Sequence, residues 1–107
     1  MEDFIFIKEG RLYVKLTFGS IVFVKASRNY VRITTQKKTH LVLMTLKEVD
    51  EILPSNKFLR IHKSYVVNLD CVLSFDQKTV YLKNILLPLG PLYKHALWKR
   101  TVPNEER

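Results

Sequence analysis

One segment near the middle of the chain interleaves cationic and apolar side chains. Residues 58–68 read Phe-Leu-Arg-Ile-His-Lys-Ser-Tyr-Val-Val-Asn. If residues 59–65 form one extended strand, alternation gives that strand a polar, cationic face made of Arg60, His62 and Ser64. Because residues 53–68 contain no Asp or Glu, an internal ion pair is not the obvious use of Arg60 and Lys63. We therefore expect their partner to be an anion outside the chain.

The donor groups of this segment suit a nucleic acid. Arg60 and Lys63 could straddle a phosphate backbone, while His62 and Ser64 add hydrogen bonds. Phosphate contacts position a protein and base contacts provide specificity, so the two roles need not fall on the same residue. For His62 the alternative is a structural role, in which its ring nitrogens are used within the fold.

A second group of donors lies upstream, where residues 26–29 read as a loop between two strands. Arg28 can bind a phosphate or the O6/N7 edge of guanine, and Asn29 can pair with N6/N7 of adenine. Asn29 has an equally good alternative, because asparagine tolerates the left-handed backbone conformation of a turn.

The charge of the chain is segregated as well as positive. The 18 Lys and Arg residues outnumber the 10 Asp and Glu residues, for a formal net charge of +8. Residues 11–47 hold eight basic residues and no acidic one, and residues 77–104 hold five and none. Such segregation indicates a surface of one sign, as polyanion-binding proteins have. The alternative is a basic protein whose charges only keep it in solution.

Other classes of site find little support in the sequence. The three histidines lie in no recognisable nucleophile–base or paired-carboxylate arrangement, so we do not expect an enzyme. Cys71 is the single cysteine, which excludes an intramolecular disulfide, and its apolar neighbours favour a small buried side chain. Without clustered ligands we expect no metal and no cofactor. No apolar run approaches the ~20 residues of a membrane span, and the acidic start is unlike a secretory signal, so we expect a cytoplasmic protein.

Hydrophobic patterning predicts a mainly β chain. The expected strands are 4–7, 12–18, 21–24, 30–34, 39–43, 71–75, 79–83 and 85–89, in addition to the central segment. We expect one domain over residues 1–107, with a core at about 4–100 and a frayed tail at 101–107.

Two helices are expected among these strands. The first begins after Thr45, which forms a capping box with Glu48. The apolar stripe of this first helix is Leu46, Val49, Ile52 and Leu53. The second begins at Gly90 and Pro91 and runs to about Arg100. Its predicted apolar stripe is Leu92, Tyr93, Ala96 and Leu97.

Four blocks of the sequence resemble the LytTR family of bacterial DNA-binding domains. They are Ser-Arg-Asn-Tyr-Val at 27–31, Met-Thr-Leu-Lys-Glu at 44–48, the central segment at 58–68 and Leu-Pro-Leu at 87–89. Their order and spacing match the family over about residues 4–100. The resemblance implies an elongated fold of about ten short strands in stacked sheets, with one or two short helices. It also implies that DNA is bound mostly by loops and turns in place of a recognition helix.

The resemblance implies site residues as well. In LytTR domains, the positions that match Arg60 and Lys63 lie at the DNA interface. The family often carries a Ser-Arg pair where this chain has Gly90-Pro91, and this departure removes a base-reading side chain. Lys94, or free backbone at Gly90, would replace that side chain only in part. Lys25 is a second departure, because the family commonly has a glutamate there, so the sequence preference of relatives should not be transferred. The candidate DNA-binding residues are Arg28, Asn29, Arg60, His62, Lys63 and Lys94.

We predict sequence-specific binding of double-stranded DNA in bacterial transcription regulation, by the output domain of a two-component response regulator or by a stand-alone regulator. The resemblance implies binding to direct repeats as a homodimer, and an N-terminal receiver domain that these 107 residues do not include. The alternative is a basic, β-rich interaction module that binds an acidic protein partner or RNA. RNA is the less favoured, because single-strand recognition uses exposed aromatic side chains and most aromatics here fit core positions.

Overall fold

The computed structural model describes residues 3–103, which form ten short strands, two α-helices and three 3₁₀ turns. The strands are β1 (Phe4–Glu9), β2 (Leu12–Thr17), β3 (Ile21–Ser27), β4 (Tyr30–Thr35), β5 (Thr39–Val42), β6 (Phe58–His62), β7 (Tyr65–Asn68), β8 (Ser74–Phe75), β9 (Thr79–Leu82) and β10 (Ile85–Pro88). The helices are α1 (Leu46–Ile52) and α2 (Lys94–Thr101), and the 3₁₀ turns are η1 (Phe18–Ser20), η2 (Leu69–Cys71) and η3 (Pro91–Tyr93). The predicted fold class, mainly β with about ten strands, is confirmed.

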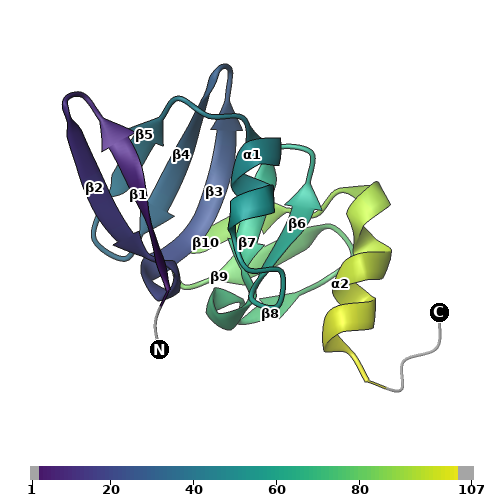
Figure 1. Ribbon diagram of the computed structural model, residues 1–107. Coiled ribbons are helices and arrows are strands. Elements are labelled where there is room, and N and C mark those ends of the chain that lie inside the picture. The colour runs from purple at the N-terminus through teal and green to yellow at the C-terminus, as the bar shows by residue number, and fades with distance from the viewer. Residues whose placement is uncertain (1–2, 104–107) are drawn as a thin grey trace.

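The strands form three antiparallel sheets. The central sheet has the order β5-β4-β3-β7-β6, the hairpin β1–β2 forms a second sheet, and β10-β9-β8 form the third. The hairpin lies toward one side of the central sheet, and the three-stranded sheet and α2 lie toward the other (Figure 1). The molecule measures 50 × 33 × 26 Å along its principal axes, so it is elongated.

Both faces of the central sheet are buried along β7, which lies between the middle strand β3 and the edge strand β6. Val66 and Val67 are both fully buried, yet they belong to different clusters of core residues because neighbouring side chains of a strand point to opposite faces. Val66 packs in the cluster that contains α1 and the β1–β2 hairpin. Val67 packs in the cluster that contains the three-stranded sheet and Leu97 of α2. This double burial explains why two apolar residues, Val66 and Val67, follow each other in β7 in place of an apolar–polar alternation.

The first helix begins as predicted. The Thr45 hydroxyl accepts a hydrogen bond from the backbone N–H of Glu48 at 3.1 Å, and the Glu48 carboxylate accepts one from the backbone N–H of Thr45 at 2.8 Å. The hydrogen bonds that the backbone N–H and then the hydroxyl of Thr45 donate to the carboxylate lower the pKa of Glu48. Leu46 and Val49 are buried against the sheet, but Ile52, predicted in the same stripe, is 44% exposed. The helix ends there, so Ile52 lies beyond the face that contacts the core.

The second helix differs more from the prediction. Gly90 does precede a helical turn with Pro91 as its first residue, but that turn is the 3₁₀ turn η3, and α2 follows it. Leu92 is 91% exposed, and Ala96 is exposed as well, so the predicted stripe is wrong for both. The change from 3₁₀ to α geometry rotates the buried face, which consists of Leu97 and the half-buried Trp98.

The end of the chain is only partly described. The ring of Trp98 packs edge-on against Phe75 at 4.8 Å between ring centroids, which anchors α2 on the three-stranded sheet. Thr101 still belongs to α2, and residues 104–107 of the predicted tail lie outside the described residues. Within residues 3–103, no helix has the length and apolar character needed to span a membrane.

Candidate nucleic-acid interface

Three segments that the sequence singled out meet at one end of the central sheet. Two of them are two-residue turns, Arg28–Asn29 between β3 and β4 and Lys63–Ser64 between β6 and β7. Strands β3 and β7 are neighbours, Lys25 pairs with Tyr65, and the backbone N–H of Ala26 donates to the Ser64 carbonyl at 2.9 Å. The third segment is joined to β6, because the N–H of Gly90 donates to the Ile61 carbonyl at 2.8 Å. Residues about 30 to 40 positions apart in the sequence are therefore held side by side.

The central segment is a hairpin, so the predicted single strand at 59–65 is wrong. Strand β6 ends at His62, Lys63 and Ser64 form the turn, and β7 begins at Tyr65. The pairing also shifts between Arg60 and His62, as a β-bulge does. Alternation cannot reveal this arrangement, because the turn contains neither Gly nor Asn and a bulge changes the periodicity.

Arg60 and His62 hold this turn together. The Arg60 guanidinium donates from Nε to the His62 carbonyl at 3.1 Å and from a terminal nitrogen to the Lys63 carbonyl. The Nδ1 atom of His62 accepts a hydrogen bond from the backbone N–H of Ser64 at 3.0 Å. Nδ1 is thus an acceptor, which places the ring proton on Nε2. His62 therefore has the structural role that we considered as an alternative, through Nδ1, and its Nε2 is not used by the turn.

The side chain of Lys63, unlike those of Arg60 and His62, does not stabilise the turn. Its side chain is exposed, and it makes no hydrogen bond or ion pair within residues 3–103. The charge of Arg60 is half-buried and engaged with carbonyl oxygens, whereas the charge of Lys63 is presented to solvent on a fixed backbone.

The turn between β3 and β4 presents a second free cation. Arg28 is exposed and has a φ of 60°, which few residues other than glycine adopt. Its side chain, like that of Lys63, has no partner among the described residues. The left-handed conformation that we considered for Asn29 is therefore found one residue earlier, since Asn29 is not among the residues with positive φ. The Asn29 amide is exposed at the tip of the turn.

The segment at Gly90 contributes less than the sequence suggested. Gly90 is buried and its N–H is already bonded to Ile61, so its backbone is not free to bind DNA. A Cβ atom at Gly90 would lie 3.0 Å from the Tyr93 ring and 3.5 Å from the His62 Cα, so glycine permits this close approach. The ammonium group of Lys94 donates to Gln77 Oε1 at 3.1 Å, which directs it to the turn between β8 and β9.

Sequence reasoning overlooked a third turn at this end. Gly10 and Arg11 join β1 to β2, with a φ of 60° at Gly10, and Arg11 is exposed. Figure 1 shows this turn and the turn between β3 and β4 at the same end of the molecule. A glycine after an apolar strand was the available signal, because Gly supplies the positive φ of a hairpin turn.

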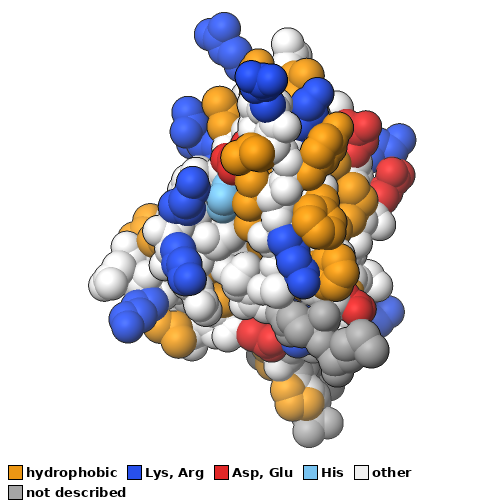
Figure 2. Space-filling view, turned by 60° about the vertical axis from the view of Figure 1, so that its left-hand side comes forward, with side chains coloured by type: hydrophobic (Ala, Val, Ile, Leu, Met, Phe, Trp, Pro, Cys, Tyr) orange, Lys and Arg blue, Asp and Glu red, His pale blue; other side chains and the backbone are white. Residues whose placement is uncertain are grey.

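Positive charge is not confined to this end. Figure 2 shows Lys and Arg side chains at the upper end, where these turns lie, and also along the lower left side. The turn between β4 and β5 carries Lys37 and Lys38, both exposed. The exposed acids Glu48 and Glu51 lie on α1, on the surface of that helix away from the sheet. Charge alone therefore does not identify the interface, and the geometry of the turns must do so.

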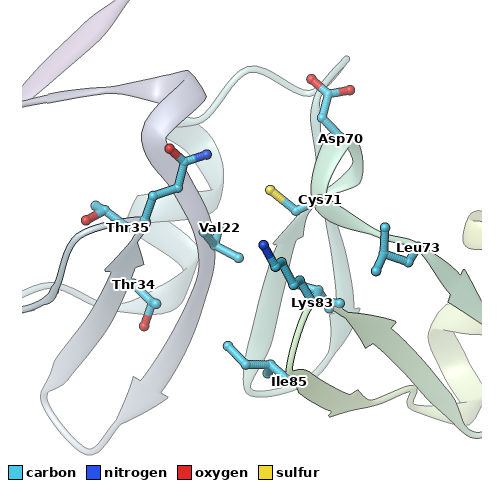
Figure 3. Close-up of a pocket in the computed structure, with 10 residues that line it drawn as sticks. Val22, Thr34, Thr35, Asp70, Cys71, Leu73, Lys83 and Ile85 are labelled. Carbon is cyan, nitrogen blue, oxygen red and sulfur yellow. The ribbon is translucent and has the colours of Figure 1, made fainter.

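A separate hollow lies where the central and three-stranded sheets meet (Figure 3). Its lining includes Val22, Thr35, Cys71, Lys83 and Ile85. Cys71 is half-buried, and burial, followed by the nearby Asp70 carboxylate, raises the pKa of its thiol. The thiol is therefore protonated and unreactive at neutral pH. Val22 and Thr35 lie at the opposite end of β3 and β4 from the Arg28–Asn29 turn, so this hollow is not part of the candidate interface.

No curated protein matches the sequence of this chain. A solved structure from Bacillus cereus, a LytTr DNA-binding domain, is similar to this chain with a TM-score of 0.81. The similarity covers 95% of this chain and 99% of the other, at 17% sequence identity, so it concerns the fold. The family model of the LytTr DNA-binding domain matches residues 11–99. These residues contain the Arg28–Asn29 turn, the Lys63–Ser64 turn and Gly90, and the chain belongs to the LytTr family of DNA-binding domains.

Proposed function

We propose that this domain binds double-stranded DNA with sequence preference and acts in bacterial transcription regulation. The observation that carries the proposal is the pairing of two free cations. Arg28 and Lys63 are both exposed, both lack a partner within the fold, and lie on turns joined by the hydrogen bond from Ala26 to Ser64. An internal role for these charges would require acceptors that the described residues do not provide.

The spacing of the turns suits a DNA groove. The four strands that carry these two turns are neighbours in the central sheet, in the order β4, β3, β7 and β6. The midpoints of the two turns are therefore two strand spacings apart, or about 10 Å. The major groove of B-DNA is about 12 Å wide. We assign Arg28, Asn29 and Lys63 to direct contact with bases or nearby phosphates. Arg60 and His62 act by fixing the backbone that carries Lys63, and the Nε2–H of His62 is free to donate to a phosphate.

The wider organisation is proposed from the family alone. We infer that residues 1–107 act as one domain, that two copies occupy direct repeats, and that the domain serves as the output of a response regulator or as a stand-alone regulator. Lys94 remains a candidate for a peripheral phosphate contact, which would require it to leave Gln77.

The test is a selection of bound duplexes from a random-sequence DNA pool. The affinity of the selected duplex and of a scrambled duplex is then measured from roughly 50 to 200 mM salt. We expect a short enriched motif, repeated about one helical turn apart, and a selected duplex that keeps its advantage at high salt. If no motif is enriched, and all binding disappears with salt, the domain is only a generic polyanion binder and the proposal fails.

A further inference from the structure

A crease with exposed apolar walls runs between the β1–β2 hairpin and strand β5. It is an open hollow of about 490 Å³. Its large apolar side chains come from four strands and the segment after β5: Phe6, Tyr13, Tyr30, Leu41 and Leu43. Leu43 is 69% exposed, Tyr13 67% and Phe6 57%. Single exposed apolar residues are ordinary, but several that line one concave surface indicate an interaction site.

The fold itself does not require these side chains to be apolar. The hydrophobic core below the crease is supplied by Ile7 and Val42, which are buried, whereas Phe6 and Leu41 alternate to the solvent side of the same strands. Strands β1 and β5 are also sheet edges, since β1 pairs only with β2, and β5 only with β4, among the described strands. These two edges approach each other at the crease, where Glu9 of β1 lies against His40 of β5, so an occupant would lie over the apolar side chains that line it.

Basic side chains lie along the crease on the β1–β2 hairpin and on β4. Lys8 lines it, Arg11 lies at the tip of the hairpin, and Arg32 is paired with Leu41 on the exposed face of β4. The nearest acidic residue along these strands is Glu9, which points to the other face. Its Oε1 lies 3.0 Å from Nδ1 of the buried His40, close enough for an ion pair when the ring is protonated, although not aligned as a hydrogen bond. Figure 2, which brings this side of the molecule forward, shows a band of hydrophobic side chains with Lys and Arg beside it, and with Asp and Glu side chains along its right-hand edge. Charge complementarity thus favours an acidic occupant.

Protein suits the crease better than a nucleic acid. Leu41, Leu43 and the half-buried Met44 provide aliphatic surface, on which bases do not stack. The hairpin aromatics beside it are also engaged with each other. Phe4 and Phe6 meet edge to face at 5.8 Å, and the Lys15 ammonium lies 4.2 Å from the Phe4 centroid. These rings do not present the open, flat faces of a base-stacking platform.

We propose that this crease is a docking site for an acidic protein segment that carries apolar anchor side chains. The segment lies over the crease, places its apolar side chains between Tyr13 and Leu43, and places its carboxylates near Lys8, Arg11 and Arg32. Because Tyr30 directly follows the Arg28–Asn29 turn, the docked partner is held next to the DNA-binding end. The crease can thereby bring a second protein to the DNA that the domain occupies.

The test uses a library of random 12-residue peptides displayed on phage, with the whole 107-residue chain as bait. The variant pair is Tyr13→Ser with Leu43→Ser, and the matched control is Leu86→Ser, since Leu86 is 67% exposed on the three-stranded sheet, away from the crease. We expect enrichment of peptides that alternate acidic and apolar residues. Their affinity should fall at least tenfold for the double variant and stay unchanged for Leu86→Ser.

Four outcomes would overturn the docking proposal. The first is that no peptide is enriched, and the second is that enriched peptides bind the double variant equally well. The third is self-association, detected by sedimentation and abolished in the double variant, which would assign the crease to a second copy of this chain. The fourth is loss of binding to a fluorescent single-stranded oligonucleotide in the double variant, which would assign the crease to nucleic acid. Duplex DNA affinity, measured on the same samples, should be equal for all three proteins, so failure of DNA binding is recognised separately.

Discussion

Two cationic turns at opposite ends of the central sheet differ in what surrounds them. The turn between β4 and β5 carries Lys37 and Lys38 and is fixed by a neutral hydroxyl. Oγ1 of Thr35 accepts hydrogen bonds from both lysine N–H groups and donates to the Lys38 carbonyl. The turn between β6 and β7 carries Lys63 and is fixed by charged Arg60 and by His62. The strand that follows this second turn is paired with β3, which leads into another rigid turn with a free cation, Arg28, and the Ala26 N–H donates to the Ser64 carbonyl between them.

This difference separates two explanations of DNA binding. If the net charge of +8 were sufficient, lysines at either end would contribute equally. If the arrangement of the turns matters, only the end with two adjacent, rigid turns should read DNA. The following substitutions distinguish these explanations.

Removing the free cations should have the largest effect. Lys63→Ala and Arg28→Ala should each weaken binding to the selected duplex by about 1–3 kcal/mol, because each removes a contact to a base or close phosphate. Lys37→Ala is the matched control at the other end and should change the affinity little. The measurement is fluorescence anisotropy at fixed salt. Equal losses for Lys37→Ala and Lys63→Ala would show that charge alone drives binding.

Arg60 tests whether rigidity contributes beyond charge. A lysine at this position keeps the charge but cannot donate two bonds in the geometry of a guanidinium. Arg60→Lys should therefore lose about 0.5–1.5 kcal/mol of DNA affinity, comparable to the loss of one hydrogen bond that fixes the turn. Amide exchange at Lys63 and Ser64 should become faster in the same variant. Full affinity together with unchanged exchange would show that only the charge of Arg60 matters.

How far the sequence predicts this interface depends on the kind of signal. The capping box at Thr45 and most of the strands are local signals, and the structure confirms them; the predicted strand at 71–75 is reduced to β8, because Cys71 belongs to η2. The neighbouring positions of Arg28 and Lys63 follow from the sheet order, which periodicity cannot supply and which the structure establishes. The roles of Arg60 and His62 depend on a bulge and a turn without glycine, so the residues that looked most like ligands are partly engaged within the fold.

The segment at Gly90 and Pro91 offers a substitution that should strengthen binding. Pro91 is exposed at the start of η3, next to β6, and the resemblance indicates an arginine here in many relatives. Pro91→Arg adds a cation at the end that already carries Arg28 and Lys63. We expect tighter binding, and a plot of log affinity against log salt that is steeper by about 1. Pro91→Gln is the uncharged control, and an equal gain for that variant would contradict an electrostatic origin.

The turn between β8 and β9 is fixed by the Asp76 carboxylate, so the stability of this turn should depend on pH in the acid range. Hydrogen bonds from the backbone N–H of Lys78, then of Thr79, and from the Tyr81 hydroxyl lower the pKa of Asp76, against a smaller opposing effect of burial. Because folding lowers the pKa of this carboxyl group, its ionised form stabilises the fold at pH values above the unfolded pKa of 3.8. This contribution disappears as the pH falls through the folded pKa. Asp76→Asn should therefore lower the urea midpoint at pH 7, and the difference from wild type should shrink as the pH falls below 3.8 and disappear below the folded pKa. Asp50→Asn on α1 is the control for the loss of one carboxylate elsewhere on the surface. A pH dependence equal to wild type in Asp76→Asn would show that the carboxylate does not fix this turn. The two cationic turns carry no such dependence on a carboxylate, so DNA binding and acid unfolding should respond to different substitutions.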